Sequence, residues 1–334
     1  MLAAALAAAA LQPQPRSLRT VGHWTAGCDN VRACRAVALV PASEDRDRYL
    51  LAVITREGEP MAQPSLRVAS GNDLPAGPLT IRIDGKLAGR ITREAALPFN
   101  RAFASMLANG RALTVHGGDG PPLAAASLRG IAAAFLHIDE QQRRLGTAGA
   151  LIRRGPRPDA TVPAPPPLPR IVQPRPTGGA PRALAAGAAA RLIGPDNARC
   201  AHASGPVRPR AIRLDARHSV ALVTHPCGNG AYNIFTSVFV VDETGRVRPA
   251  AFDAGTGMDP DGADPNMLVN ADWDAKRRRL TGFAKGRGLG DCGTMQEYAW
   301  NGRDFRLAEQ RDMGECRGSI DYITTWRAAV TTAR

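Results

Sequence analysis

Prolines concentrated in the middle of the chain constrain its fold more than any other feature. Ten of them fall between residues 155 and 182 of the 334-residue sequence. Proline lacks a backbone N–H and disfavours helix at the preceding residue, so this segment is expected to form neither helix nor sheet and to act as an extended linker. A chain of this length is long enough to form two domains, each with its own hydrophobic core. We therefore predict an N-terminal domain over residues 19–154 and a C-terminal domain over residues 183–334.

The N-terminal domain is predicted to contain an antiparallel sheet. Its clearest hairpin covers residues 79–87, where apolar and polar residues alternate around Asp84-Gly85, a pair that suits a type I′ turn. Further strands are expected at residues 49–54, 65–69 and 112–116.

Two helices are expected in the same domain, because apolar residues recur at helical spacing in two places. The first has Pro98 in its first turn and ends at Gly110. The second covers residues 127–145, with Ser127 as its N-cap and Gly146 beyond its end.

The C-terminal domain is predicted to be an antiparallel β meander that follows a short alanine-rich helix at residues 183–193. Asn301-Gly302 is typical of a second type I′ turn. The expected strands cover residues 219–224, 234–241, 247–252, 267–273, 280–283, 297–300 and 304–307. The predicted fold class is therefore mainly β (α+β), in two disulfide-bonded domains.

Cysteine usage indicates an oxidising compartment. No two cysteines form a C-x-x-C pair, and none has zinc-site spacing with histidine, so an even count favours disulfides. The six cysteines are Cys28, Cys34, Cys200, Cys227, Cys292 and Cys316.

The first residues indicate export. Residues 2–11 are almost entirely alanine and leucine, and residues 8–10 provide a small-residue cleavage site, although no basic residue precedes them. We interpret residues 1–18 as a signal peptide and leader, which predicts a periplasmic or secreted protein. No other stretch is long and apolar enough to cross a membrane.

The formal net charge is +13, carried almost wholly by arginine, with only three lysines. This composition is also typical of codon bias, so it favours a polyanion partner only weakly. The densest basic patch, residues 276–279, is expected to be exposed in a turn. Because Trp273 is the only nearby aromatic residue, nucleic acid is not an expected partner, and an envelope protein or polyanion is the candidate.

A glycine-rich stretch at residues 285–293 is the candidate binding loop. It matches neither G-x-G-x-x-G nor a P-loop and is followed by no helix signal, so no nucleotide or other cofactor is expected. We expect a tight loop, pinned by a disulfide, that presents side chains on a rigid backbone. With the similar glycine-containing turn upstream, it supplies the candidate binding residues Lys285, Arg287, Asp291, Tyr232 and Asn233.

Catalytic and metal signatures are missing from the sequence. There is no G-x-S-x-G, S-x-x-K or H-E-x-x-H motif, so no catalytic or metal-binding residue is predicted. The acidic run at residues 259–264 departs from a calcium loop, since Asn270 stands where glutamate is required; an irregular calcium site is left as an alternative. His225, two residues before Cys227, leaves open an activated thiol.

Four of these patterns together resemble the uncharacterised bacterial family catalogued as domain of unknown function 1176. They are Cys227-Gly-Asn-Gly-Ala-Tyr-Asn233, Gly286-Arg-Gly-Leu-Gly-Asp-Cys-Gly293, Trp300-Asn-Gly-Arg-Asp-Phe305 and Glu315-Cys-Arg-Gly318. The resemblance covers nearly the whole chain after the leader and implies an exported six-cysteine protein, with no established activity and no catalytic residues. Residues 24–131 are also similar to the invasion-associated locus B proteins.

Pairing within domains leaves three disulfide arrangements, and proximity in sequence favours Cys28–Cys34, Cys200–Cys227 and Cys292–Cys316. We interpret the chain as a non-catalytic envelope binding or structural module. The alternative is an enzyme with an unrecognised site near residues 286–293, in which Asp291 acts as an acid.

Overall fold

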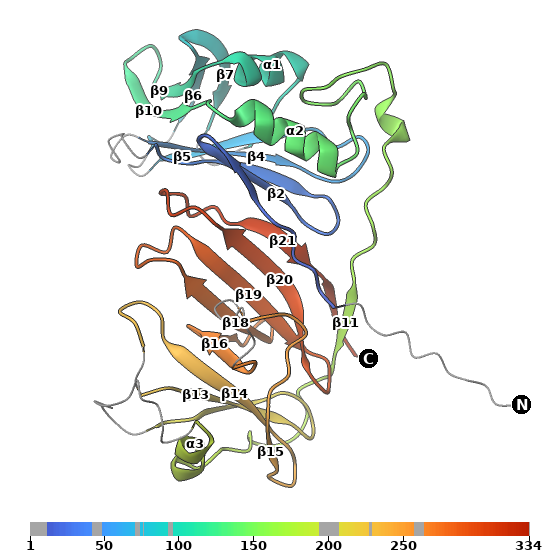
Figure 1. Cartoon of the computed structure of the whole chain (residues 1–334), viewed down its shortest axis with the longest axis vertical. Helices are drawn as coiled ribbons and strands as arrows, with labels where there is room; N and C mark the ends of the chain where they lie inside the picture. The colour runs from blue at the N-terminus through green and yellow to red at the C-terminus, as the bar shows by residue number, and fades with distance from the viewer. Residues whose placement is uncertain are drawn as a thin grey trace, which may run out of the picture.

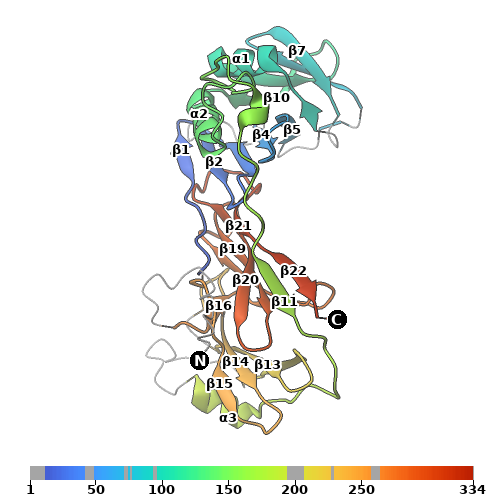
Figure 2. The same cartoon turned by 90° about the vertical axis from the view of Figure 1, so that its right-hand side faces the viewer.

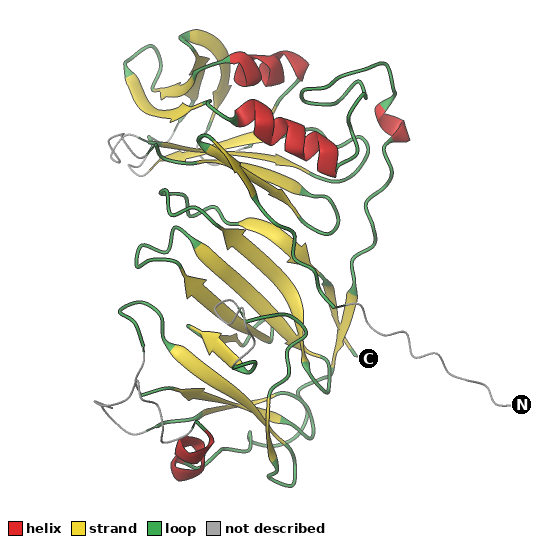
Figure 3. Cartoon of the chain, in the orientation of Figure 1, coloured by secondary structure: helices red, strands yellow, loops and turns green. Residues whose placement is uncertain are grey.

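The structure is a computed structural model that describes most of the chain. The described residues are 12–41, 49–70, 74–75, 77–92, 96–193, 207–226, 229–256 and 264–333. Strands dominate and almost all pair antiparallel, which confirms the predicted mainly β class (Figures 1 and 3). Within the described residues, no helix is both long and apolar enough to cross a membrane.

The N-terminal half is built on a six-stranded antiparallel sheet that the chain crosses in nearly sequential order (Figure 1). From edge to edge its strands are β1 (Arg19–Val21), β2 (Trp24–Cys28), β3 (Cys34–Ala38), β4 (Leu50–Arg56), β5 (Ser65–Ser70) and β8 (Leu97–Pro98). Cys28 and Cys34 face each other in register on β2 and β3 and form the predicted disulfide.

A second sheet and two helices complete this half. In order, the sheet contains β10 (Pro122–Ser127), β9 (Ala112–His116), β6 (Leu79–Ile83) and β7 (Lys86–Ile91); the helices are α1 (Arg101–Asn109) and α2 (Ile131–Gln141). Both sheets and both helices share one apolar core, in which Trp24, Leu113 and Phe135 are fully buried. Positive φ angles at Asp84 (48°) and Gly85 (77°) confirm the predicted turn between β6 and β7.

The proline-rich segment is anchored to both halves. Arg32 donates hydrogen bonds to the carbonyl oxygens of Pro163 (3.0 Å) and Ala164 (2.8 Å). Beyond a 3₁₀ turn at η2 (Asp159–Thr161), β11 (Arg170–Gln173) pairs in parallel with β22 (Ala329–Thr332). The expectation that this segment forms no sheet is therefore wrong at β11. Prolines flank that strand without interrupting it, so its N–H groups stay available for pairing.

The C-terminal half consists mainly of two five-stranded antiparallel sheets. The first contains β12 (Arg210–Arg213), β13 (Ser219–Thr224), β14 (Phe235–Val241) and β15 (Val247–Pro249), with β16 (Met267–Val269) also paired to β14. The second is a meander of β17 (Asp272–Asp274), β18 (Arg279–Lys285), β19 (Gly293–Trp300), β20 (Phe305–Met313) and β21 (Ile323–Arg327). Helix α3 (Ala186–Leu192) precedes them. Trp300, Tyr298 and Phe305 are fully buried in the core between the sheets.

The predicted Cys292–Cys316 disulfide is present and ties the start of β19 to the loop before β21. Cys200 and Cys227 lie outside the described residues, so their predicted pairing stays a prediction.

The two halves pack against each other where β21 lies beside β2 and β3 (Figures 1 and 2). Val37 and Val53 of the N-terminal sheet share an apolar cluster with Met313, Tyr322 and Ile323. The cluster removes apolar surface of both halves from water, which stabilises their association.

Polar contacts fix the same interface. The side chain of Asn30 donates to the carbonyl oxygen of Arg327 (3.0 Å) and accepts from its backbone N–H (2.8 Å). The Arg327 guanidinium pairs with the buried carboxylate of Asp29. The end of the expected leader also joins here, because the N–H of Arg16 donates to the carbonyl oxygen of Thr325 (3.1 Å). Residues 1–11 lie outside the described residues.

Both N-terminal helices begin later than the sequence predicts. Ser127 is not an N-cap, because it ends β10 by pairing with Ala112; Gly130, at φ 104°, caps α2 instead. A Cβ at Gly130 would lie 1.9 Å from the carbonyl oxygen of Val21, which leaves no space for a side chain there. Pro98 belongs to β8, and Asn100 caps α1.

Two predictions for the C-terminal half are also wrong. Residues 267–273 form two strands separated at Asn270, whose φ of 47° breaks the extended conformation. The turn at Asn301-Gly302 is not type I′, because β19 and β20 close at Trp300 and Phe305 over a four-residue loop. In that loop Asn301 accepts the N–H groups of Arg303 (2.9 Å) and Asp304 (2.8 Å) through its side chain.

Candidate functional site

The structure brings the predicted binding residues together on two adjacent loops, residues 229–234 and 285–292, which we call the two-loop platform. Asn233 joins them: its amide donates to the carbonyl oxygen of Lys285 (2.9 Å), and its oxygen accepts the Lys285 N–H (3.2 Å). Asn270 donates to the carbonyl oxygens of Tyr232 (3.1 Å), in the first loop, and Phe283 (2.8 Å), on β18 just before the second loop, and so joins the two segments.

Glycines in the second loop serve its tight path. The Gly286 N–H donates to the carbonyl oxygen of Cys292 (2.8 Å), and the Gly290 N–H donates to that of Arg287 (3.0 Å). Gly290 has a φ of 67°, and a Cβ at Gly286 would lie 2.6 Å from the Cys292 sulfur. The alternating glycines are therefore explained by the turn and the disulfide, without a ligand.

Asp291 is the centre of this loop and is fully engaged. Its carboxylate pairs with Arg287, whose Nε donates at 2.7 Å, and it accepts the backbone N–H of Gly318 at 2.7 Å. The Arg287 hydrogen bonds outweigh burial and hold the pKa of Asp291 below its usual range. Asp291 is thus an ionised structural anchor, with no proton to give at neutral pH.

Apolar side chains project from the platform. Leu289 is 70% exposed, Ile234 47% and Tyr232 39%. Tyr232 lies against the second loop, because a Cβ at Gly288 would be 3.3 Å from its ring. The Lys285 ammonium lies 5.4 Å from the centre of the Phe283 ring. The platform therefore presents apolar side chains on backbone held by hydrogen bonds and a disulfide.

The basic turn at residues 276–279 is not the free patch that the sequence suggests. Arg277 pairs with Glu297. Arg278 donates to the carbonyl oxygen of Pro174 (2.7 Å), and Arg279 donates to the side chain of Gln173 (2.6 Å). Arg278 and Arg279 fasten the linker to the C-terminal sheet, and with Arg277 three of the four basic side chains are already occupied.

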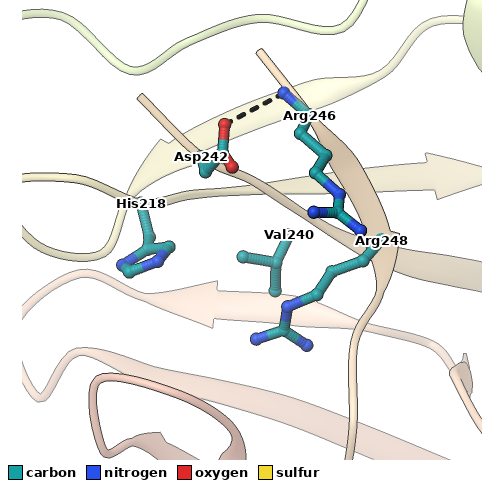
Figure 4. Close-up of a pocket in the computed structure, with 5 residues that line it drawn as sticks. All are labelled: His218, Val240, Asp242, Arg246 and Arg248. Atoms are coloured by element: carbon teal, nitrogen blue, oxygen red, sulfur yellow. Dashed lines mark hydrogen bonds between the residues drawn. The ribbon is translucent and has the colours of Figure 1, made fainter. Parts of the chain in front are cut away.

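A second cluster, which the sequence did not single out, surrounds a cavity of about 170 Å³ beside β13, β14 and β15 (Figure 4). Its lining residues are His218, Val240, Asp242, Arg246 and Arg248. In Figure 4 the imidazole of His218 lies on one side of the hollow, both guanidinium groups lie on the other, and Val240 lies between them.

His218 is held in place from beneath the cavity. Its Nδ1 lies 2.9 Å from Asp215, whose other oxygen accepts the indole N–H of Trp300 at 2.7 Å. Burial opposes ionisation of Asp215, but hydrogen bonds from the Trp300 indole, the Arg217 backbone N–H and His218 outweigh it and keep the pKa of Asp215 below its usual value. Because an ionised carboxylate only accepts, the proton lies on Nδ1, and Nε2 is the ring atom left for other partners.

Asp215 and His218 are three residues apart, a spacing visible in the sequence, whereas Trp300 and Arg248 come from distant segments. No group of three or more metal-ligating side chains occurs within the described ranges. Cys227 lies outside those ranges, and of the acidic run at residues 259–264 only the last residue lies within them. His225, which the sequence suggested as a partner that could activate the Cys227 thiol, has its Nε2 2.8 Å from the Ser237 hydroxyl.

Comparison with known proteins places the chain among uncharacterised relatives. A family described as protein of unknown function (DUF1176) has a sequence model that matches residues 18–332. The uncharacterized protein YpfG of Escherichia coli (strain K12) is 34% identical over 237 residues, 67% of this chain and 65% of that protein. The chain therefore aligns with somewhat less than two thirds of that relative's length. No solved structure matches. The resemblance of residues 24–131 to the invasion-associated locus B proteins is not shown by either match.

Proposed function

The chain belongs to the DUF1176 family of unknown function, and we propose that it is an exported, non-catalytic module that binds an envelope protein through the two-loop platform. The observation that carries this proposal is the exposure of Leu289, Ile234 and Tyr232 on rigidly held loops. Exposed apolar side chains on a preorganised backbone lose little entropy on binding and gain from being removed from water.

The internal pairing of Asp291 and Arg287 supports binding over acid catalysis at this loop. Each side chain already meets the charge of the other, and the Asp291 carboxylate also holds Gly318. An enzyme with Asp291 as its acid would need that carboxyl group protonated and within reach of a substrate. The alternative of an enzyme centred on this loop is therefore less favoured.

Two disulfides support an oxidising compartment, and the alanine- and leucine-rich leader supports export to it. In a Gram-negative host, N-terminal sequencing of protein from the periplasmic fraction is expected to begin near residue 11. Full-length protein confined to the cytoplasm would contradict export.

The binding proposal is tested with a matched pair of surface variants. Leu289→Glu places a charge on the platform, whereas Leu87→Glu makes the same change at a side chain that is 61% exposed on β7. Affinity capture from a periplasmic extract, followed by mass spectrometry, is expected to recover one protein with wild type and Leu87→Glu and to lose it with Leu289→Glu. With that protein purified, Leu289→Glu is expected to weaken Kd at least about tenfold. Equal capture by both variants would contradict the proposal.

A further inference from the structure

We propose that the cavity lined by His218, Arg246 and Arg248 binds a phosphate group. The site is separate from the two-loop platform. In the antiparallel pair β13–β14, Ser219 faces Val241 and Thr224 faces Thr236. The cavity lies at the end of this strand pair marked by Ser219 and Val241, and the loop that carries Tyr232 lies at the opposite end, next to Thr224 and Thr236.

Arg246 supplies a cation that has no partner in the described part of the chain. Its backbone N–H donates to Asp242 (2.9 Å), which fixes the position of the residue, while its guanidinium is exposed at the cavity. A guanidinium carries five N–H donors and suits the oxygens of a phosphate group.

Arg248, on β15, has a side chain that is already ordered by contacts within the protein. Its guanidinium donates to the carbonyl oxygens of Pro249 (3.3 Å) and Arg303 and lies 5.9 Å from the centre of the Trp300 ring. These contacts use only part of its five donors. Because the side chain is already ordered, binding an anion costs little further side-chain entropy.

His218 provides the third polar group, and its orientation is set by Asp215. Nδ1 is used by the carboxylate, so Nε2 is the ring atom available to a ligand, and Figure 4 shows the imidazole beside the hollow. Nε2 can accept from a protonated phosphate oxygen when the ring is neutral and donate to an unprotonated oxygen when the ring is charged. Polar groups on three segments suit a tetrahedral oxyanion better than a planar carboxylate, which offers only two oxygens.

Charge and size agree with an anion of one phosphate group. Among the described residues that line the cavity, Asp242 is the one carboxylate, and its Oδ1 already accepts from the hydroxyl and N–H of Thr244 and from the N–H of Arg246. Asp304, 3.9 Å from Arg248, is paired with Arg303 at 2.8 Å. The two guanidinium groups therefore outnumber the single carboxylate. A volume of about 170 Å³ above the buried Val240 admits a phosphate group but not a whole nucleotide.

The test uses isothermal titration calorimetry of the full-length protein with inorganic phosphate. Arg246→Gln and Arg248→Gln each remove a donor, and Arg217→Gln is the matched control, because Arg217 is exposed next to His218 but does not line the cavity. Wild type and Arg217→Gln are expected to bind phosphate saturably with the same Kd. Arg246→Gln and Arg248→Gln are expected to weaken Kd about tenfold or more. Arg246 is exposed, so its variant is expected to fold normally, and circular dichroism of the variant checks this.

Two further titrations identify the source of the phosphate group. Glycerol 3-phosphate represents a soluble phosphomonoester, and phosphatidylcholine vesicles with or without phosphatidic acid represent a lipid headgroup. Arg246-dependent binding of either probe supports the site and assigns its source. No saturable binding of any probe to wild type would overturn the proposal. Equal weakening by Arg217→Gln and Arg246→Gln would also overturn it, because binding would then follow overall charge.

Discussion

At the scale of single residues, the ionised Asp291 links two separate loops through Arg287 and Gly318. We expect Asp291→Asn to lower the free energy of unfolding by about 2 kcal/mol at pH 7. Arg287 loses its counter-charge, and the asparagine NH2 group cannot accept the hydrogen bonds that one carboxylate oxygen accepts. The pKa of Asp291 is depressed in the folded protein. The stability that its carboxylate contributes is therefore fully present above the unfolded pKa of about 4 and is lost as pH falls through the folded pKa.

Urea unfolding of wild type and Asp291→Asn between pH 7 and pH 2.5 tests this linkage. The gap between the two proteins is expected to close at acid pH. Asp119→Asn is the control, because Asp119 is fully exposed in its ion pair with Arg82 and should change stability little at any pH. A gap that stays constant with pH would show that the carboxylate charge is not what stabilises the loop.

The second cluster shows where residue-level prediction reached its limit. Asp215 and His218 are three residues apart in the sequence, but only the turn seen in the structure brings Nδ1 within 2.9 Å of the carboxylate. The sequence gives no sign that Trp300, 85 residues further along, closes the cluster. Nor does it indicate that Arg246 and Arg248 face the same cavity, because that depends on the pairing of β14 with β15.

At the scale of elements, the β6–β7 hairpin was predictable because its turn chemistry is local. Asp84 and Gly85 both take positive φ, and Gly85 has open space around its Cα. We expect Gly85→Ala to lower the free energy of unfolding by about 1 kcal/mol through backbone strain alone. Gly117→Ala should be nearly neutral, since Gly117 has no positive φ and its Cβ would meet only Leu123 at 3.7 Å. Equal effects of the two changes in thermal unfolding would contradict this account.

Other elements could not be predicted, because their ends depend on distant partners. Ser127 has the chemistry of a helix N-cap, yet it is drawn into β10 by pairing with Ala112, and its carbonyl oxygen accepts the indole N–H of Trp24 (2.8 Å). Arg144, which lies in the last turn of the predicted helix at residues 127–145, is beyond the end of α2, fully buried, and donates to the carbonyl oxygen of Pro60 (2.7 Å). In both cases a tertiary hydrogen bond outweighs a local preference.

The Cys292–Cys316 disulfide couples the start of β19 to the interface between the two halves of the molecule. Cys292 lies in the apolar cluster between them, and Arg317, next to its partner, donates to the carbonyl oxygen of Val40 (3.0 Å). We expect Cys292→Ser to cost about 3 kcal/mol by the chain-entropy estimate. Because of the Arg317 contact, hydrogen exchange should accelerate in residues 286–318 and also near Val40.

Cys28→Ser is the matched control for that experiment. Its disulfide closes a loop with a sequence separation of 6, against 24 for Cys292–Cys316, so the entropic loss should be smaller, about 2 kcal/mol. Exchange should then accelerate around β2 and β3. Protection unchanged near Val40 in Cys292→Ser would show that the disulfide stabilises the C-terminal half alone.

At the scale of the whole molecule, strand and turn patterns along the sequence predicted the class of the fold, and the concentration of prolines predicted the linker. These patterns did not predict that the halves would pack together, because the interface joins residues such as Asn30 and Arg327, which lie 297 positions apart. The boundary at residues 155–182 remains our proposal for where the two domains meet. What the structure adds is that this segment carries β11 and that the halves share an apolar cluster.

The last prediction separates tethering by the linker from packing of the halves. Residues 165–168 lie between the carbonyl oxygen of Ala164, which binds Arg32, and that of Pro169, which binds Ala329. A protease site inserted between Pro166 and Pro167 should therefore be cut without disturbing either anchor. Because the interface buries Val37, Val53 and Ile323 and pairs Asp29 with Arg327, the cut halves are expected to co-elute in size-exclusion chromatography.

Interface variants of the same cleavable protein decide whether that association is specific. Arg327→Ala leaves the carboxylate of Asp29, which is 1% exposed, buried without its cation, at a cost of about 3 kcal/mol. After cleavage the halves of this variant should separate at protein concentrations where wild-type halves stay together. Arg303→Ala is the control, since the Arg303 side chain is 88% exposed and lies away from β21, on the β19–β20 turn. If wild-type halves separate on the first cut, the linker is the only effective connection and the interface seen in the structure contributes no lasting association.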